Sequence, residues 1–289
     1  MTDPSPKRQV VLSAAILFSL VLSGAPAQSQ NYTPLLPLPL GDAVLNLPTP
    51  HVLAPGTWEM KFTHRFLQPV NGENSDVHSF WGLDGSADVG IGLAYAPMRD
   101  FQLSVIRTSA QDDFEIAGKY LVLRQAPDFP LTASFRAGID WRTERDLEDR
   151  VSPFGQVILS KQFVRRLEVF AVPTYVANAG PFDHAFNIPF GLAWSMRPGL
   201  LLSLEVIPPN PDLPDDFDSD LGWSIGLKRA LGGHYFEVML SDSPGTHVDH
   251  YGTSSFGGLG IDSGNIFLGF NIERRFGRGH RQPTPAIPE

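Results

Sequence analysis

Apolar and polar residues alternate along residues 57–67, which read TWEMKFTHRFL. The large apolar side chains share one parity, interrupted only by His64, and the charged side chains share the other. Because successive side chains of a β-strand point to opposite faces, this segment is predicted to form a strand with one apolar and one charged face. About eleven further segments repeat this period of two, so the chain is predicted to form about 12 strands. They are residues 57–67, 86–96, 101–107, 114–123, 131–141, 154–163, 167–176, 186–196, 200–207, 221–228, 234–241 and 265–276.

The predicted connections alternate in length. The short connections are residues 97–100, 124–130, 164–166, 197–199 and 229–233. The alternate connections are mostly long and polar, at residues 68–85, 142–153, 177–185, 208–220 and 242–264. The TSAQDD link is of intermediate length. This alternation is typical of a meander whose two ends face different compartments. The predicted fold is therefore all-β: a transmembrane up-and-down antiparallel β-barrel of about 12 strands, with short periplasmic turns and long extracellular loops.

Aromatic residues on the apolar parity gather near the short-turn ends of their strands. They are Trp58, Tyr95, Phe101, Tyr120, Trp194 and Phe276. This placement is typical of an aromatic girdle at a bilayer interface. The opposite parity of two strands is rich in small residues, namely Gly222, Ser224 and Gly226 and then Gly191, Ala193 and Ser195. Such residues are unusual on a solvent-exposed sheet face and suit a narrow, crowded lumen.

Two predicted strands contain a proline, Pro173 in one and Pro189 in the other. Proline cannot donate a ladder hydrogen bond, and a closed barrel has no free edge to accommodate it, so we expect bulges at both positions. Residues 154–163 show only a weak alternation. The sequence therefore leaves open which face of that strand points inward.

The N-terminal residues have the pattern of a secretory signal. Lys7 and Arg8 precede a mostly apolar run over residues 10–22, and Ala25 and Ala27 supply the small residues of a cleavage site. The alternative is a single transmembrane anchor, for which the run is short. We expect a signal peptide at 1–27, a Pro/Leu-rich lead-in at 28–55 that is either periplasmic or lies in the lumen, a barrel at 56–276 and a polar tail at 277–289. These features predict export to the bacterial outer membrane.

Composition narrows the functional classes. A net charge of -9 argues against a nucleic-acid partner, which requires clustered Lys and Arg. The absence of cysteine excludes disulfides, thiolate metal sites, c-type haem attachment and a lipid-modified N-terminal cysteine. The high numbers of glycine (27), proline (26) and phenylalanine (20) suit many short strands joined by turns.

Four stretches carry a resemblance to a known family: His64-Arg65-Phe66, GLDGSADVGIGLAYA over 82–96, GGHYFEVMLSDS over 232–243 and GNIFLGFNIERRF over 264–276. They resemble an uncharacterised family of bacterial single-chain outer-membrane β-barrels, a domain of unknown function. The resemblance implies the fold and the outer-membrane location, and no activity. The last strand also resembles the signal read by the barrel-assembly machinery, although Arg274 interrupts its apolar parity and a polar tail follows Phe276.

Catalysis is not predicted. Some barrels hydrolyse lipids with a His and a Ser two residues apart on one strand face, but none of the eight histidines has that spacing. His78 and Ser79 are adjacent, so they would point to opposite faces of a strand. The G-x-S-x-G match around Ser224 lies inside an alternating strand, without the strand-turn-helix context of a nucleophile elbow.

Two segments contain possible metal ligands. The acidic stretch 211–220 lacks the spacing of an EF-hand and is interpreted as a solvated loop. His247 and His250 flank Asp249 without clear further ligands, and they are interpreted as surface histidines. A phosphate cradle at the glycines of 257–260 lacks the required context. Accordingly, no metal or cofactor is predicted.

The polar parity supplies charges of both signs for the predicted lumen. These residues are Glu59, Lys61, Arg65, Asp88, Glu115, Lys119, Arg136, Asp140, Glu168, Glu205, Lys228, Glu237, Glu273 and Arg275. They could form ion pairs that plug the barrel or line an aqueous path with opposed rows of charge. A barrel of about 12 strands is compatible with either outcome.

The leading functional hypothesis is a monomeric channel or uptake protein for a small polar solute, surrounded by outer-membrane lipid. The alternative is a non-conducting structural or partner-binding barrel. A soluble periplasmic ligand-binding barrel and a lipid-hydrolysing enzyme rank below both.

Overall fold

The computed structural model describes residues 41–73, 75–110, 113–143, 151–164, 166–179, 182–211, 213, 217–256 and 259–277. The predicted signal peptide, the first part of the lead-in at 28–40 and the tail from residue 278 onward lie outside these residues. Within the described part of the chain, no helix is long and apolar enough to cross a membrane.

Strands account for most of the ordered structure, as the period of two predicts. They are β1 (Thr57–Phe66), β2 (Ala87–Met98), β3 (Phe101–Thr108), β4 (Asp113–Leu123), β5 (Thr132–Arg142), β6 (Val151–Val164), β7 (Leu167–Ala171), β8 (Thr174–Ala179), β9 (Phe182–Asn187), β10 (Phe190–Arg197), β11 (Leu200–Ile207), β12 (Gly222–Leu231), β13 (His234–Ser241) and β16 (Phe267–Gly277). A separate pair, β14 (Ser255–Phe256) and β15 (Leu259–Gly260), forms a two-stranded sheet.

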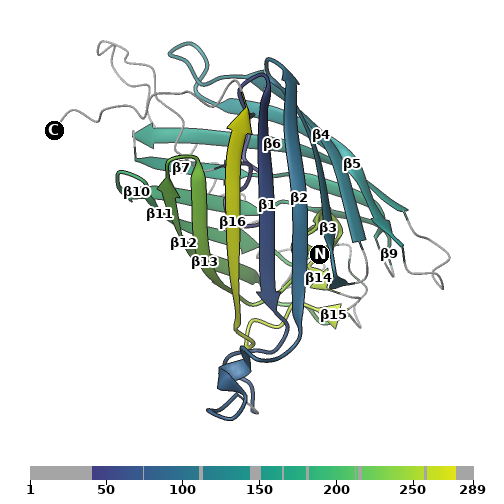
Figure 1. Ribbon diagram of the computed structural model, residues 1–289. Coiled ribbons are helices and arrows are strands. Elements are labelled where there is room, and N and C mark those ends of the chain that lie inside the picture. The colour runs from purple at the N-terminus through teal and green to yellow at the C-terminus, as the bar shows by residue number, and fades with distance from the viewer. Residues whose placement is uncertain are drawn as a thin grey trace.

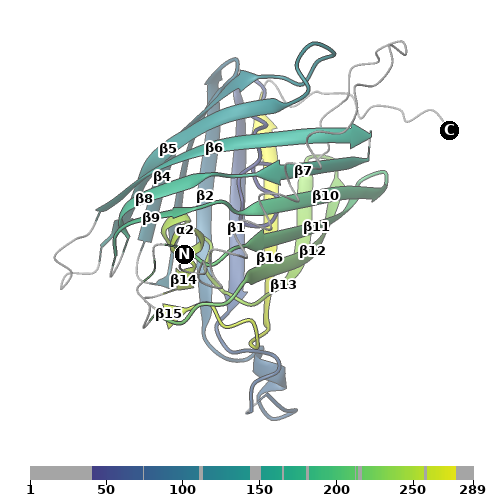
Figure 2. The same ribbon diagram turned by 180° about the vertical axis from the view of Figure 1, so that it is seen from behind.

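The sheet closes on itself. Strand pairs in the described part of the chain are antiparallel, β1 pairs with both β2 and β16, and the pairing of β5 with β6 completes the ring. β7 and β8 lie end to end along β6, and β9 and β10 also follow one another end to end. Each of these two pairs occupies one strand position, so the wall is a closed antiparallel barrel with 12 strand positions. Strands β16, β1 and β2 stand side by side in Figure 1, and the strands β5 to β10 form the opposite wall in Figure 2. The predicted fold class is confirmed.

Prolines cause both interruptions of the wall. The seventh predicted strand breaks at residues 172–173 and the eighth at 188–189, next to Pro173 and Pro189. The strands remain connected across these breaks, because Val157 N donates to Pro173 O at 3.0 Å and Val172 N donates to Pro189 O at 2.9 Å. We expected bulges, and the structure instead has a break in each strand.

The buried residues of β6 show which face of this strand points into the barrel. Even-numbered side chains of this strand point inward, and two of them are large and apolar, Phe154 and Ile158. The pattern is weak in the sequence because apolar residues occupy both faces of this one strand. They pack inside the barrel with Leu47, Val176 and Val248.

The outer face of the barrel is apolar and the inner face is polar, the reverse of a water-soluble protein. The predicted girdle residues lie on the outer face near the short turns, where Trp58 stacks on Tyr95 with ring centroids 4.1 Å apart. Phe101 pairs with Tyr120, and Phe276 pairs with Trp58, in the adjacent strands. The girdle therefore depends on how adjacent strands are paired as well as on which face of the strand each aromatic side chain occupies.

Three connections differ from the prediction. Residues 177–185, predicted as a long loop, belong mostly to β8 and β9, and β6 already begins at Val151 within the predicted loop 142–153. The predicted loop 242–264 contains the short helix α2 (Val248–Thr253), which the sequence analysis missed. Figure 2 shows α2 behind the wall, toward the end of the barrel that carries the long connections.

Candidate functional site in the barrel interior

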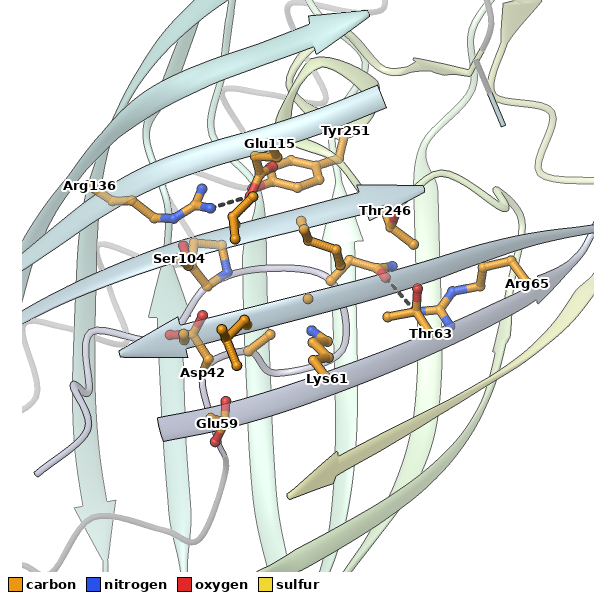
Figure 3. Close-up of a pocket in the computed structure, with 18 residues that line it drawn as sticks. Asp42, Glu59, Lys61, Thr63, Arg65, Ser104, Glu115, Arg136, Thr246 and Tyr251 are labelled. Carbon is orange, nitrogen blue, oxygen red and sulfur yellow. Dashed lines mark hydrogen bonds and ion pairs between the residues drawn. The ribbon is translucent and has the colours of Figure 1, made fainter. Parts of the chain in front are cut away.

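A cavity of about 70 Å³ lies inside the barrel, among the inward-facing side chains of β1 to β5. Figure 3 shows Glu59, Lys61 and Arg65 along β1 on one side of this cavity, and Glu115 and Arg136 paired on the other. Asp42 and Asn46 complete it from the N-terminal segment, and Thr246 and Tyr251 from the connection after β13. The site is therefore built by the wall together with two segments that enter the barrel.

The first of these is residues 41–53, which we call the plug segment. Glu205 Oε1, on β11, accepts three successive backbone N–H groups of this segment, from Leu45, Asn46 and Leu47, at 2.8, 2.9 and 2.8 Å. Val44, Leu45 and Leu47 are fully buried. One carboxylate thus satisfies backbone donors that have no strand partner, and this anchors the plug segment to the wall.

Other wall residues bind the plug segment along its length. Lys119 forms an ion pair with Asp42, and Lys228 Nζ donates to Ala43 O at 3.1 Å. Ser134 Oγ donates to Pro50 O at 2.5 Å. Leu53 N donates to Gln102 Oε1 at 3.0 Å. The lead-in, at least from residue 41, therefore lies in the lumen, which was one of the two alternatives for this segment.

The small residues of the inner face make room for the plug segment. A Cβ added at Gly226 would lie 2.5 Å from Leu45 Cδ2, and one added at Gly191 would lie 3.5 Å from Val44 Cγ2. The two strips of small residues therefore form the surface on which Val44 and Leu45 lie. A larger side chain at Gly226 would occupy the same space as Leu45.

The second inserted segment contains α2. Val248 N donates to Glu115 Oε2 at 3.0 Å, and Asp249 N donates to Asp140 Oδ2 at 3.1 Å. Gln156 Nε2 donates to the Tyr251 hydroxyl at 3.0 Å. Wall carboxylates therefore hold the backbone of this segment by the same kind of contact that Glu205 makes with the plug segment.

The 14 residues predicted to line the lumen all lie on inward-facing positions of the wall. Twelve are buried, and Lys61 and Arg275 are half-buried. They are Glu59, Lys61, Arg65, Asp88, Glu115, Lys119, Arg136, Asp140, Glu168, Glu205, Lys228, Glu237, Glu273 and Arg275.

The structure brings many of these charges together as pairs. Lys228 Nζ lies 3.6 Å from Glu237 and 3.8 Å from Glu273, while Arg275 Nε contacts Glu59 Oε2 at 2.5 Å. Arg136 pairs with Glu115. Three of these pairs join neighbouring strands, and the Lys228–Glu273 pair joins β12 to β16 past the intervening β13.

Other wall charges are paired with groups outside the predicted list. Arg65 donates to Asn271 Oδ1 at 2.9 Å and to Asn46 Oδ1 at 3.0 Å. Glu168 contacts His51 Nε2 at 3.1 Å and accepts from Ser160. Asp88 accepts from Ala110 N at 2.8 Å, near the long-connection end of the barrel. The predicted residues therefore form several local networks rather than one.

Several interior residues are not predicted by the alternation of charged and apolar positions. Gln102, Gln156 and Asn271 share the inward parity but are uncharged, so a search for charges passed over them. Asp42 lies in an aperiodic segment, where parity gives no signal. Asp113 lay in the predicted TSAQDD link, but the structure places it at the start of β4.

The interpretation of His247 and His250 as surface residues is wrong. Only 1% of His247 and 4% of His250 is exposed, because α2 is inserted into the barrel. Of the acidic stretch 211–220, residue 212 and residues 214–216 lie outside the described part of the chain. Leu213 within it is buried.

The candidate nucleophiles lie in settings unlike a catalytic site. Ser224 is buried within β12, and its Oγ donates to Ser241 Oγ at 2.9 Å. The strand continues through this residue to Leu231. His78 and Ser79 lie in the β1–β2 connection, outside the barrel wall.

The pKa values of groups in the inserted segments are shifted by burial and by the wall charges. Burial disfavours the charged form of Asp42, but the Lys119 ammonium, together with Arg136 and Lys61, outweighs burial and holds the pKa of this carboxyl below its usual range. Burial raises the pKa of Tyr251 well above its usual value, against the effect of Arg136. Burial also lowers the pKa of His247. At neutral pH Asp42 is therefore an anion, and Tyr251 and His247 are neutral.

Comparison with solved structures finds barrels of low sequence identity. An outer-membrane channel from Pseudomonas putida F1 is 10% identical, with a TM-score of 0.48, over 78% of this chain and 97% of that one. The NanC porin is 7% identical, with a TM-score of 0.45, over 76% and 99%. Outer membrane phospholipase A from Escherichia coli is 12% identical, with a TM-score of 0.41, over 83% and 96%.

Sequence similarity identifies a family. None of the curated proteins shows significant similarity to this chain. A family model described as "Membrane bound beta barrel domain (DUF5777)" matches residues 41–276, which include the plug segment and the wall up to Phe276. The chain therefore belongs to this family of membrane-bound β-barrel domains.

Proposed function

We propose that this chain is an outer-membrane channel for small polar solutes, closed in the described conformation by its own plug segment. The observation that carries the proposal is how the plug segment is attached. It is bound to the wall by side chains such as Glu205, Lys119 and Gln102 and is not a strand of the barrel. The plug segment can therefore leave the lumen while the hydrogen bonds between the strands stay intact.

The proposed path runs through the cavity beside β1. Lys61 and Arg65 supply positive charge there, and Glu59 and Glu115 supply negative charge. Charges of opposite sign facing a narrow polar path orient a dipolar solute and disfavour an apolar one. A solute that bears both a cationic and an anionic or strongly polar group fits this arrangement.

The proposed location and orientation follow from the asymmetry of the two ends. Tight turns join β10 to β11 and β12 to β13 at one end, and the connections after β1, β11 and β13 are long at the other. In outer-membrane barrels the short turns face the periplasm. The plug segment would then be reached from the periplasm through residues 28–40, after removal of a signal peptide at 1–27.

A second candidate function is a non-conducting barrel that serves as an anchor or binds a partner. It is favoured by the depth at which the plug segment is held, with Val44, Leu45 and Leu47 fully buried. A plug segment that never leaves the barrel would make the interior charges structural. Both candidates treat the protein as non-enzymatic, so phospholipid hydrolysis by the purified protein would contradict both.

Conductance in planar bilayers separates the two candidates. The mature chain from residue 28 and a variant lacking residues 28–53 are refolded, and folding is verified by heat-modifiable migration in gels. If the protein is a channel, the mature chain gives rare or small conductance steps and the deletion variant gives larger and more frequent ones. A folded deletion variant that remains silent overturns the channel proposal and supports the anchor.

Ion selectivity provides the second readout. Arg65→Ala removes a buried positive charge beside the cavity, so the open channel should shift toward cations. Arg124→Ala is the matched control, because Arg124 is an exposed arginine at the short-turn end that pairs with Asp100. Equal selectivity in both variants would place the conducting path elsewhere.

A further inference from the structure

Three side chains with the chemistry of metal ligands converge where α2 meets the wall. Asp113 begins β4, and His247 and Asp249 belong to the connection after β13. One ligand atom from each of them lies within 4.8 Å of the others, and all three residues are buried. Asp113 lies more than 130 residues before His247 and Asp249 in the sequence, so only tertiary structure brings it to them.

His247 lacks the hydrogen bonds that a buried imidazole normally makes. It is 1% exposed, and neither ring nitrogen has a hydrogen-bond partner among the described residues. Asp249 Oδ1 likewise has none within the described chain. Buried polar atoms without partners are rare and costly, and a bound ion is one of the groups that can satisfy such atoms. These unsatisfied atoms belong to the same cluster of side chains as Asp113.

His250 supplies a possible fourth ligand. Its Nε2 lies 3.8 Å from Asp249 Oδ1 and 3.9 Å from Asp113 Oδ2. The rings of His247 and His250 are nearly parallel, with centroids 5.8 Å apart. Two imidazoles and two carboxylates make a four-ligand set of the kind that binds Zn²⁺.

Asp140 is placed to orient the site without belonging to the ligand set. Its Oδ1 lies 3.9 Å from His247 Nδ1, and its Oδ2 accepts the backbone N–H of Asp249 at 3.1 Å. A carboxylate that faces one ring nitrogen of a histidine leaves the other nitrogen available to a metal. Asp140 would therefore leave His247 Nε2 as the ligand atom.

We propose that Asp113, His247, Asp249 and His250 bind a divalent first-row transition metal of the Zn²⁺ class. Imidazole nitrogens favour such metals, whereas Ca²⁺ and Mg²⁺ prefer sets made of oxygen alone. Ligand atoms of a tetrahedral Zn²⁺ site are about 3.3–3.6 Å apart, given bonds of about 2.0–2.2 Å, and the ligand atoms of Asp113, His247 and Asp249 lie within 4.8 Å of one another. The group therefore closes by a small rotation of side chains around the ion. The bound metal ties the inserted segment to β4.

Metal binding to the folded full-length barrel tests the proposal. The protein is refolded in detergent without a histidine tag, treated with a chelator and dialysed, and then titrated with Zn²⁺ by calorimetry. We expect one Zn²⁺ per chain. His247→Ala and Asp249→Asn should each weaken binding at least tenfold, whereas His78→Ala should leave it unchanged, because His78 is an exposed histidine outside the barrel. Asp140→Asn should weaken it by about 10- to 100-fold, as expected for an orienting partner.

Co²⁺ gives a readout that does not depend on the variants. Intense visible absorption bands, typical of tetrahedral Co²⁺, support the proposed ligand set in the wild-type protein. Weak bands, typical of octahedral Co²⁺, contradict it. The proposal is overturned if Zn²⁺ binds no more tightly than to the His247→Ala variant, or if Ca²⁺ binds in its place. Heat-modifiable migration verifies that each variant is folded, and His247→Gln replaces His247→Ala if that variant does not fold.

Discussion

Glu205 Oε1 accepts the backbone N–H of Leu45 at 2.8 Å, across 160 residues of sequence, and this contact joins the middle of β11 to the plug segment. Because the same oxygen also accepts from Asn46 and Leu47, Glu205→Ala leaves three N–H groups without an acceptor. We expect a loss of about 2–5 kcal/mol of unfolding free energy, since hydrogen bonds to charged groups contribute about 1.5–3 kcal/mol each and are not additive.

Denaturant unfolding in detergent measures this loss. Glu205→Gln is the matched control, because its side-chain oxygen can still accept at least one of these hydrogen bonds, and it should be less destabilised. Equal stability of wild type and Glu205→Ala would show that the plug segment is not held through this residue.

Gly226 is expected to tolerate no larger side chain while the plug segment is in place. A Cβ there would lie 2.5 Å from Leu45 Cδ2 and 3.0 Å from Val238 O, so Gly226→Ala should cost about 1–3 kcal/mol through overpacking. Gly155 is the matched control, because a Cβ there would meet nothing within 4 Å. If the cost at Gly226 comes from Leu45, the additional substitution Leu45→Ala should recover part of it, and a fully additive double variant would contradict the contact.

Asp242, directly after β13, should make stability depend on pH. Burial raises the pKa of its carboxyl to about 7, with Asp220 and Asp262 adding to the effect against hydrogen bonds from Trp223 N. A pKa that is higher in the folded state than in the unfolded state favours folding while the group is protonated. This contribution is complete below the ordinary pKa of 3.8 and is lost as the pH rises through about 7.

The unfolding free energy of the wild type should therefore fall more steeply between pH 4 and pH 8 than that of Asp242→Asn. Asparagine keeps an oxygen that can accept the Trp223 N–H, so the comparison isolates the charge. Parallel pH profiles for the two proteins would assign the dependence to other groups.

The apolar outer face predicts a cost that depends on depth in the membrane. Ile116 lies in the middle of β4, paired with Val105 and Ile139, and is 44% exposed. Ile116→Arg should cost about 2–4 kcal/mol in lipid vesicles, whereas Met98→Arg, near a short turn, should cost about 0–1 kcal/mol. Similar costs at both positions would contradict the assigned membrane zone.

The amino-acid sequence by itself determined the barrel wall of this protein. In a strand, neighbouring side chains must face opposite ways, so the alternation in residues such as Glu59, Met60 and Lys61 specified both the strand and its two environments. The positions of the two irregularities also follow from the sequence, because Pro173 and Pro189 have no N–H to donate, but bulges were predicted there and the strands break instead. The weak pattern of β6 could not be interpreted, since Phe154 and Ile158 point inward against the general rule.

Only tertiary structure decided what fills the barrel. The plug segment has no period, and its partners, such as Gln102 and Glu205, lie 49 to 160 residues away in sequence. His247 was assigned to the surface because local sequence carries no signal that α2 folds back into the lumen beside Asp113 and Asp140. Strand formation is dictated by neighbouring residues, but burial of an aperiodic segment depends on distant residues that only the closed barrel brings together.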